Sequence, residues 1–350
     1  MTGNEFLSNI RSISFDHSQS NVKRTIFFAG FSVLLAYPLI PLLIYFFPKT
    51  AQRMMLFSYT SKSDNLSDLQ KNGIKSKGRN FYLKNRKGLR IGLYHIFPMS
   101  STFNFDKTKD TGGNFEDALK SLNDPIILYC HGIFGDRGKE NRINIYNSMT
   151  SWNYHVITLD YCGIGDSDGV TNEESCVESI ILVVEYLYSL VRNNFFVWGH
   201  SSGTSILLRA IAVLYEKKIT PLGCFLEGPF NDNCNILKLD WRYKLYSWIP
   251  FIDNILFQSV LTNSLNLEMF SYLQKVNCPI QIFHSNSNSM VTKEYYEDLY
   301  HYIKNANRDI DIIIFHEYLE DNNIFNAKNL EELVAKFESK CLSKRVNQDN

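Results

Sequence analysis

From residue 125 onward, short apolar runs alternate with longer segments that carry an apolar stripe at helical spacing. The runs predict strands at residues 125–130, 155–161, 195–199, 223–227, 279–284 and 309–315. The other segments predict helices near residues 139–152, 173–192, 202–217, 293–305 and 328–341. Repeated strand–helix units give a mostly parallel sheet with helices on both faces, so an α/β fold is expected. A hairpin of residues 80–83 and 89–96 precedes this alternation.

A glycine-rich turn joins the strand at 195–199 to the helix at 202–217. It reads G-H-S-S-G from Gly199 to Gly203, a G-x-S-x-G pattern centred on Ser201. The two glycines let strand and helix close around a strained turn that exposes the Ser201 hydroxyl, so we expect unusual backbone angles at Ser201. The pattern arises by chance in roughly one chain in ten of this length, so the flanking strand and helix carry the argument that Ser201 is a nucleophile.

A second motif follows the strand at 125–130, where residues 131–135 read H-G-I-F-G. A loop of this kind after an early strand supplies a backbone N–H group to an oxyanion hole. We assign the two oxyanion donors to the backbone N–H groups of Ile133 and Ser202, the second at a helix N-terminus. The imidazole of His131 is expected to hydrogen-bond the backbone and to take no part in the chemistry.

Charge and cysteine content limit the ligands of this chain. Lysine plus arginine and aspartate plus glutamate each number 36, and this balance argues against a nucleic-acid partner. The seven cysteines are scattered, with no C-x-x-C and no cysteine–histidine cluster of metal spacing. We therefore predict neither a metal site nor a cofactor. Buried free thiols are expected at Cys130, Cys224 and Cys278.

The residues from Thr25 to Phe47 contain no charged side chain. The stretch is long enough to cross a hydrocarbon core of about 30 Å as a helix, so we predict a transmembrane helix at residues 25–47. A cleaved signal peptide fits less well, since its apolar region is shorter and a small-residue cleavage site follows it. A buried core helix would carry polar positions. Basic residues near the two ends are about equal in number, which leaves the orientation open.

These patterns divide the chain into four parts. Residues 1–24 are predicted to be a mobile tail, residues 48–79 a juxtamembrane segment, and residues 80–345 one α/β domain. Segment 229–275 interrupts the strand–helix alternation and is rich in tryptophan, tyrosine and phenylalanine. It is predicted to be a cap-like insert over the site, and the alternative is a helical excursion packed on the sheet.

The motifs together resemble one family. The sequence of residues 115–119 leads into the strand at 125–130 and the H-G loop, residues 154–169 end in G-I-G-D-S-D-G, and residues 226–232 read L-E-G-P-F-N-D. In this order and spacing they resemble α/β-hydrolase domain-containing protein twelve and its relatives, over residues 80–340 and the preceding span. The resemblance implies an α/β-hydrolase fold and a membrane-anchored serine lipase acting on lysophosphatidylserine and monoacylglycerols. It also implies a single-pass protein of the endoplasmic reticulum with a lumenal hydrolase domain.

The chain departs from the family pattern at two catalytic positions. The family's acid follows the seventh strand, but residues 284–291 read H-S-N-S-N-S-M-V, and Asn288 matches the acid's position. The family's histidine lies several residues past the last strand, where this chain has Asp321 or Asn322. His316, directly at the end of that strand, is the only histidine that follows it and is therefore the candidate base.

Three further residues bear on this departure. Cys162 takes the place of an arginine in the family's Asp-Tyr-Arg sequence, so that arginine's structural hydrogen bonds are lost. Glu227 and Asp232, at and after the end of the strand at 223–227, are alternative acids, although a structural role in the loop is preferred for both.

Two hypotheses follow for the function. The first is a membrane-anchored serine hydrolase of lipid esters, with the bilayer and a lipid ester as its partners and Ser201, His316 and Asn288 as a weakened triad. The second is a catalytically impaired hydrolase-fold protein that binds lipid or a protein partner, because the acid and base positions are not filled by aspartate and histidine. Neither hypothesis requires a cofactor.

Overall fold

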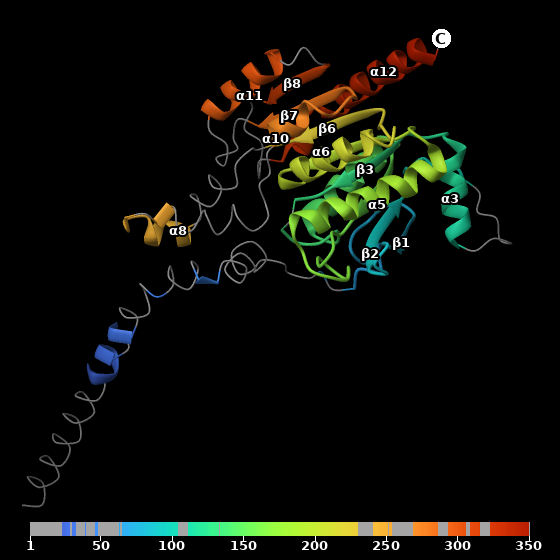
Figure 1. The fold of residues 1–350 in the computed structure, drawn as a ribbon. Helices are drawn as coiled ribbons and strands as arrows, with labels where there is room; N and C mark the ends of the chain where they lie inside the picture. Colours follow the sequence, from blue (N-terminus) through green and yellow to red (C-terminus); the bar gives the residue numbers. More distant parts are fainter. Residues whose placement is uncertain are drawn as a thin grey trace, which may run out of the picture. The chain divides into compact units, whose positions relative to one another are not determined.

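The structure is a computed structural model of the 350-residue chain. It describes residues 23–28, 30–32, 39, 46–47, 63, 65–103, 111–132, 134–229, 241–250, 252–253, 269–285, 293–305, 309–315 and 323–349. The chain divides into two units, one of Met1–Met54 with Leu245–Asn263 and one of Met55–Lys244 with Ser264–Asn350. The second unit contains the sheet (Figure 1).

In the first unit, residues 23–28 and 30–32 are helical. Of the helices formed by described residues, none combines the length and the apolar character that a membrane crossing requires. The rest of the predicted span, apart from residues 39 and 46–47, lies outside the described residues.

Eight strands form one sheet in the order β1-β2-β4-β3-β5-β6-β7-β8. The hairpin strands β1 (Gly78–Lys84) and β2 (Arg90–Ile96) are antiparallel to each other, and β2 is antiparallel to β4. The remaining pairs are parallel, and their strands are β3 (Ile126–Cys130), β4 (His155–Leu159), β5 (Phe196–His200), β6 (Gly223–Glu227), β7 (Ile280–Ser285) and β8 (Ile310–Phe315). The carboxyl ends of β3 to β8 therefore share one edge of the sheet.

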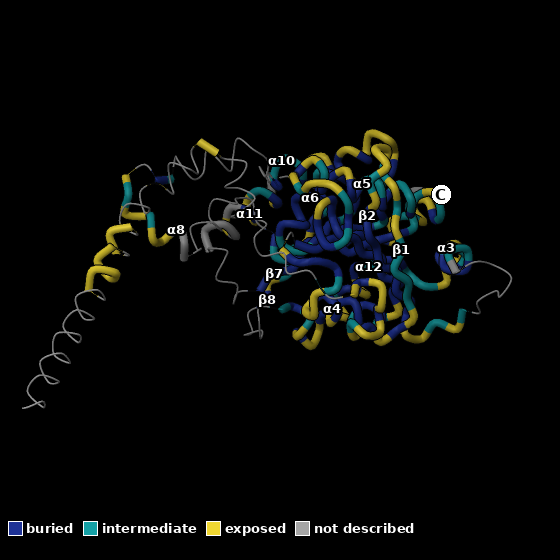
Figure 2. The backbone as a smooth tube through the Cα atoms, turned by 90° about the horizontal axis from the view of Figure 1, so that it is seen from below, coloured by how far each residue is buried: buried dark blue, intermediate teal, exposed yellow. Residues whose placement is uncertain are grey.

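Helices cover both faces of the sheet. They are α3 (Thr111–Ser121), α4 (Glu140–Ser151), α5 (Glu173–Val191), α6 (Ser202–Tyr215), α10 (Met269–Leu273), α11 (Lys293–Asn305) and α12 (Leu330–Asp349). A further short helix, α8 (Trp241–Tyr246), lies between β6 and α10 in the sequence. On one face, alternate strand residues such as Leu128 and Val197 pack with α5 and α6. On the other face, Tyr129 and Trp198 pack with α4 and α12, so the strands run through a core buried on both sides (Figure 2). This double burial explains the continuous apolar runs in the sequence.

The predicted strands and the four helices at 139–152, 173–192, 202–217 and 293–305 are confirmed to within two residues. α3, which begins at Thr111, was not predicted from the sequence. Phe115, Ala118 and Leu119 are all buried, and their i, i+3, i+4 spacing gives the helix an apolar face that outweighs the low helix propensity of Gly112 and Gly113.

The last helix also differs from the prediction, since α12 continues past residue 341 to Asp349. No glycine or proline interrupts this extension. Ion pairs fix it to the end of the sheet, where Lys340 approaches Asp311 at 2.6 Å and Lys344 pairs with Asp309. Of the predicted cap-like insert, residues 230–240, 251 and 254–268 lie outside the described residues, so its role stays a prediction.

Candidate active site

The strand order places two motifs next to each other. β3 lies between β4 and β5, and the H-G loop follows β3 while Ser201 follows β5. The helix after β3, α4, packs on one face of the sheet, whereas the helix after β5, α6, packs on the other. Helices that leave neighbouring parallel strands toward opposite faces open a crevice above the carboxyl ends of those strands. This topological switch point is where an α/β sheet offers a binding site.

A sharp turn at Ser201 joins β5 to α6. Ser201 has φ 54° and ψ −127°, so the strained backbone predicted from the G-x-S-x-G spacing is confirmed. Such angles cost a non-glycine residue about 1–3 kcal/mol and persist only where neighbours enforce them. The Ser201 N–H donates to the carbonyl of Glu227 at 2.9 Å, and the Ser201 carbonyl accepts from the N–H of Thr204 at 3.0 Å.

The two glycines of this motif are required by close backbone contacts. A Cβ atom on Gly203 would lie 2.4 Å from the carbonyl oxygen of Cys130 and 2.6 Å from that of His131. A Cβ atom on Gly199 would lie 2.8 Å from Cα of Thr204. Neither position leaves room for a side chain, so the turn packs directly against the start of the H-G loop.

Gly132 brings the H-G loop to the turn. A Cβ atom there would lie 3.5 Å from Cβ of Ser201 and 3.5 Å from Oγ of Ser202. Ser202 is buried as the first residue of α6, where backbone N–H groups have no intrahelical acceptor. Ile133 lies outside the described residues, so the pair of oxyanion donors assigned from the sequence stays a prediction.

A buried arginine that the sequence analysis did not single out holds the H-G loop. Arg142, on α4, donates to the carbonyl oxygens of Gly132 at 2.8 Å, Phe134 at 2.5 Å and Asp136 at 2.5 Å. Three carbonyls of one short loop therefore point at a single guanidinium group. No sequence motif singles out Arg142 for this contact, because an isolated basic residue on a helix is common.

The imidazole of His131 faces away from the solvent and is fully buried. Its Nδ1 lies 2.6 Å from the carbonyl oxygen of Gly132, and its Nε2 lies 3.2 Å from Oδ1 of Asp160. The hydroxyl of Tyr161 donates to the carbonyl of His131 at 2.6 Å. These contacts agree with the structural role expected for this imidazole.

A second buried arginine, Arg137, supplies a guanidinium group at the start of the G-I-G-D loop. Its backbone N–H donates to Asp160 at 2.6 Å, and its Nη1 contacts both Asp160 and Asp166, the latter at 2.7 Å. Burial raises the pKa of Asp160, but the hydrogen bond from His131 and the charge of Arg137 outweigh it and hold this pKa below its ordinary value. Cys162 stands in the same loop, and its thiol donates to the carbonyl of Asp168 at 3.0 Å.

Glu227, at the end of β6, is a buried carboxyl group next to the turn. Its Oε2 accepts from Nε1 of Trp198 at 2.9 Å, and its Oε1 lies 3.8 Å from Nε2 of His200. Burial raises the pKa of Glu227 to about 8 and lowers the pKa of His200 to about 3. At neutral pH both groups are therefore uncharged, and the contact with Trp198 agrees with the structural role preferred for Glu227.

The candidate base and acid are not among the residues that the structure describes. His316 and Asn288 lie outside them, as do Asp232, Asp321 and Asn322. Within the described part of the chain, no side chain hydrogen-bonds Oγ of Ser201. The same part holds no group of three or more histidine, cysteine, aspartate or glutamate residues that could bind a metal ion. The roles of His316 and Asn288 therefore stay predictions.

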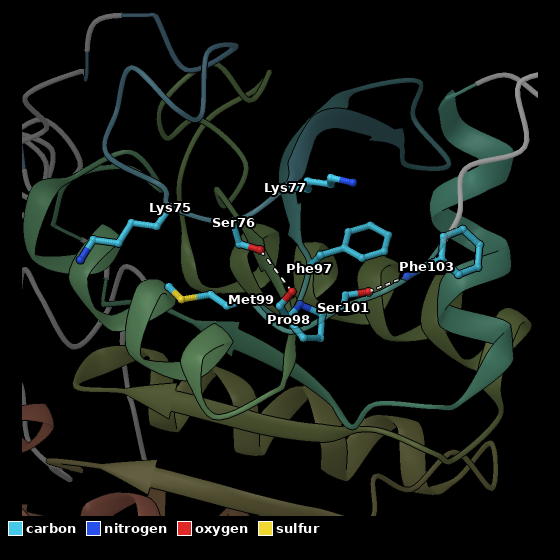
Figure 3. Close-up of a pocket in the computed structure, with 8 residues that line it drawn as sticks. All are labelled: Lys75, Ser76, Lys77, Phe97, Pro98, Met99, Ser101 and Phe103. Atoms are coloured by element: carbon cyan, nitrogen blue, oxygen red, sulfur yellow. Dashed lines mark hydrogen bonds between the residues drawn. The ribbon is translucent and has the colours of Figure 1, made fainter.

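A cavity of 320 Å³ lies away from this site (Figure 3). It is lined by Lys75, Ser76, Lys77, Phe97, Pro98, Met99, Ser101 and Phe103. β2 is antiparallel to β4 and ends at Ile96, opposite Val156, so Phe97 lies near the amino ends of the parallel strands. Ser201 follows a carboxyl end, so the cavity and the turn occupy opposite edges of the sheet.

No family model matches the chain. The chain is 28% identical to "Lysophosphatidylserine lipase ABHD12" of Danio rerio over 222 residues, which cover 63% of this chain and 57% of the relative. It is 30% identical to the protein of the same name from Rattus norvegicus, over 61% of this chain and 53% of the relative. The matched part thus spans little more than half of these two proteins. "Protein ABHD12B" of Homo sapiens is 30% identical over 295 residues, 82% of this chain and 80% of the relative.

Solved structures share the fold. An esterase from Pyrococcus furiosus superposes with a TM-score of 0.57 at 13% identity, covering 81% of this chain and 97% of the esterase. An alpha-beta hydrolase from Vibrio vulnificus superposes with a TM-score of 0.59 at 14% identity, covering 81% of this chain and 91% of the hydrolase. These likenesses show the α/β-hydrolase fold, and the match to the human relative extends over most of both proteins. On this evidence the chain belongs to the ABHD12 family.

Proposed function

We propose that this chain is a membrane-anchored serine hydrolase that cleaves lipid esters of the monoacylglycerol or lysophospholipid type. The observation that carries the proposal is the strained backbone of Ser201, φ 54°, in the turn between β5 and α6. Strained residues cluster at functional sites, and a serine in such a strand-to-helix turn is the nucleophile of α/β-hydrolases. Gly132 of the H-G loop lies directly beside Ser201.

The proposed reaction is acyl transfer through Ser201. Its Oγ attacks the ester carbonyl, and the N–H groups of Ile133 and Ser202 hold the oxyanion that forms. His316 takes the serine proton and delivers it to the departing alcohol, and Asn288 orients the imidazole. Water then hydrolyses the acyl-enzyme by the same route and releases the fatty acid.

The amide at position 288 makes the proposed enzyme a slow one. Replacement of a triad aspartate by asparagine lowers turnover by about four orders of magnitude in a serine protease, although some cysteine enzymes use an asparagine successfully. We therefore expect weak hydrolysis that depends on Ser201 and His316.

The substrate class rests on the relatives and on the proposed membrane anchor. The two relatives from Danio rerio and Rattus norvegicus are named lysophosphatidylserine lipases. Within the uncharged segment 25–47, the side chains of Ile26, Phe27, Phe28 and Phe31 are 50–67% exposed. Apolar side chains exposed in a row mark a surface that a bilayer or a partner covers. We further propose that the chain resides in the endoplasmic reticulum with its hydrolase domain in the lumen.

A second candidate function is a catalytically impaired hydrolase-fold protein that binds lipid or a protein partner through the same crevice. The sequence of residues 284–291, which contains no carboxylate, favours this candidate. Loss of both acid and base would leave only the oxyanion hole and substrate binding, worth roughly 10³–10⁴-fold over water.

Fluorophosphonate labelling and monoacylglycerol hydrolysis by the full chain in detergent decide between the two. The variants are Ser201→Ala and His316→Ala, and the exposed His301→Ala on α11 serves as the matched control. The hydrolase proposal predicts labelling and hydrolysis that are lost in the first two variants and retained in the control. Absence of both signals from the wild-type chain would favour the impaired protein, and hydrolysis that survives Ser201→Ala would reject Ser201 as the nucleophile.

A further inference from the structure

The cavity at the amino edge of the sheet (Figure 3) is built from one strongly basic segment. Residues 69–105 contain eight lysine and arginine residues and no aspartate or glutamate, whereas the whole chain has 36 charged residues of each sign. Every described residue that lines the cavity belongs to this segment. The described lining therefore carries two lysines and no carboxylate.

Hydrogen bonds hold the walls of the cavity in place. The N–H of Phe97 donates to the carbonyl of Lys77 at 2.8 Å, so the walls prolong the pairing of β1 with β2 by one residue pair. The N–H of Lys75 donates to Oδ1 of Asn147, on α4, at 3.0 Å. Walls that are tied to both a strand pair and a helix are formed before a ligand arrives, so binding does not have to order them.

The wall beside Phe97 is apolar. The ring of Phe97 stacks on the imidazole of His95 with centroids 5.2 Å apart, and it meets the ring of His155 edge-on at 4.9 Å. Burial lowers the pKa of both histidines, to about 4 for His155, so both rings are neutral at pH 7. The carboxylate of Asp124 lies 4.0 Å from Nε2 of His155 and is not among the described lining residues. The side chain of Met99 adds to the apolar lining.

The charge of Lys75 is available to a ligand. Lys75 and Lys77 are both exposed, and their side chains extend to opposite sides of Ser76 (Figure 3). Toward the other end of the basic segment, Arg90 is paired with Asp168 at 3.1 Å. Lys75, in contrast, forms no ion pair within the part of the chain that the structure describes. Its flexible stem lets the ammonium group approach an anion at the mouth of the cavity.

We propose that this cavity binds a small amphiphilic anion, with its anionic head at Lys75 and Lys77 and its apolar tail against Phe97 and Met99. The volume of 320 Å³ is at the lower end for ligand sites and corresponds to roughly ten water-sized groups of about 30 Å³ each. Octanoate, with about ten non-hydrogen atoms, matches this size. The cavity and Ser201 occupy opposite edges of the sheet, so the inference does not depend on the proposed hydrolase function.

Equilibrium dialysis of radiolabelled octanoate against the full chain in phosphatidylcholine nanodiscs tests the binding, with empty nanodiscs as the blank. We expect one saturable site per chain with a Kd of about 0.1–1 mM, as a ligand of this size allows. Octanol lacks the charge and acetate lacks the tail, so each should bind at least about tenfold more weakly. Absence of saturable binding above the blank, or equal affinity for octanol or acetate, would overturn the inference.

A double variant tests the role of the two lysines. Lys75→Gln with Lys77→Gln should raise the Kd for octanoate by about tenfold, because it removes both charges and leaves the apolar wall intact. The matched control is Lys71→Gln with Lys84→Gln, two exposed lysines of the same segment that are not among the described lining residues. This control removes the same net charge and should leave the Kd within about twofold of the wild-type value. An unchanged Kd in the first variant, or an equal rise in both, would contradict the proposal.

Methionine methyl signals locate the ligand. In the full chain labelled with methyl-¹³C methionine, octanoate should shift the signal of Met99, which Met99→Leu identifies. The buried Met269, on α10, should keep its shift. A saturable shift at Met269 with none at Met99 would place the anion elsewhere and reject this cavity as its site.

Discussion

The backbone N–H of Ser201 donates to the backbone carbonyl of Glu227 at 2.9 Å, which continues the β5–β6 ladder one residue past the strand. This hydrogen bond ties the strained residue to the neighbouring strand at the point where the chain turns into α6. The side chain of Glu227 is buried behind the same turn against Trp198. The geometry of Ser201 therefore depends on β6 as well as on the glycines of its own motif.

Gly203→Ala should destabilise the fold and abolish any Ser201-dependent activity. The new Cβ atom would lie 2.4 Å from the carbonyl oxygen of Cys130, and backbone atoms on both sides would have to move. We expect a loss of at least about 3 kcal/mol in the free energy of unfolding, measured by denaturant titration. Gly88→Ala is the control, because Gly88 has φ +78° but open space around it, and it should cost only about 1 kcal/mol. Equal losses in the two variants would contradict the close contact.

Glu227→Gln should stabilise the chain at neutral and alkaline pH. Burial raises the pKa of Glu227 from its ordinary value of 4.5 to about 8, so the folded state binds more protons than the unfolded state between these values. The stability of the wild-type chain is therefore fully present below pH 4.5 and falls as the pH rises toward 8. The amide removes this dependence and retains an acceptor for Trp198, so a gain of roughly 3 kcal/mol is expected at pH 7 and none at pH 4.

Thermal unfolding of both proteins between pH 4 and pH 9 measures this difference. Glu216 is exposed at the end of α6, so Glu216→Gln is the control and should leave the dependence of thermal stability on pH unchanged. Parallel pH profiles for wild type and Glu227→Gln would show that Glu227 is ionised in the folded chain.

Acid should destabilise the chain through the buried pair of His95 and His155, whose Nε2 and Nδ1 atoms lie 3.2 Å apart. Burial lowers the pKa of His155 from 6.5 to about 4 and lowers that of His95 in the same direction. The folded state binds fewer protons than the unfolded state in this range, so stability is present above pH 6.5 and falls as the pH falls toward 4. For His155 alone the loss amounts to about 3 kcal/mol.

His155→Gln should reduce the change in the unfolding midpoint between pH 6.5 and pH 4, as followed by circular dichroism. The exposed His301→Gln should leave the slope unchanged. An unaltered slope in His155→Gln would assign the acid sensitivity to other groups.

Asn288→Asp should raise the hydrolysis of a monoacylglycerol by at least about tenfold, because a carboxylate orients and stabilises the charged base better than an amide. The gain requires a histidine that the new carboxylate can orient, so His316→Ala should cancel the gain. Asn286→Asp in the same stretch is the matched control and should leave kcat unchanged. If Asn288→Asp alone does not raise hydrolysis but the double variant Asn288→Asp with Asn322→His does, His316 is not the base.

Membrane topology gives a prediction that is independent of the site. In intact microsomes, residues 80–350 should resist added protease, as the proposed lumenal orientation requires. Detergent should make them susceptible. Digestion without detergent would place the hydrolase domain on the cytoplasmic side and contradict the proposed orientation. Asn65, in the sequence Asn65-Leu66-Ser67, is the only candidate for N-glycosylation, and it should carry any glycan that forms.

The local features of the fold were accessible from the sequence, whereas its long-range polar contacts were not. Largely apolar runs identified β3 to β8. Burial on both faces leaves few polar positions in β3 to β7, whereas β8 lies at the edge of the sheet and is partly exposed. The spacing of Gly199, Ser201 and Gly203 identified the strained turn. α3 was missed because adjacent glycines mask an apolar face that only tertiary packing reveals.

The contacts that hold the site required the folded chain. Arg137 and Arg142 are unremarkable basic residues in the sequence, and their partners stand next to them only after β3, β4 and α4 have packed. Cys162, in place of the family's arginine, predicted the loss of that arginine's structural hydrogen bonds. A guanidinium group from another segment, that of Arg137, contacts Asp160 and Asp166 in this loop, and no local sequence pattern encodes that contact.

The position of β3 between β4 and β5 has a consequence for synthesis. β3 ends at Cys130 and consists of five fully buried residues, but its second partner, β5, ends at His200. At a ribosomal rate of about 5–20 residues per second, one edge of this apolar strand waits on the order of 4–14 s for its neighbour. An unpaired apolar strand is a template for association with other chains during that interval. The nascent chain should therefore engage chaperones most strongly before residue 200 has left the ribosome.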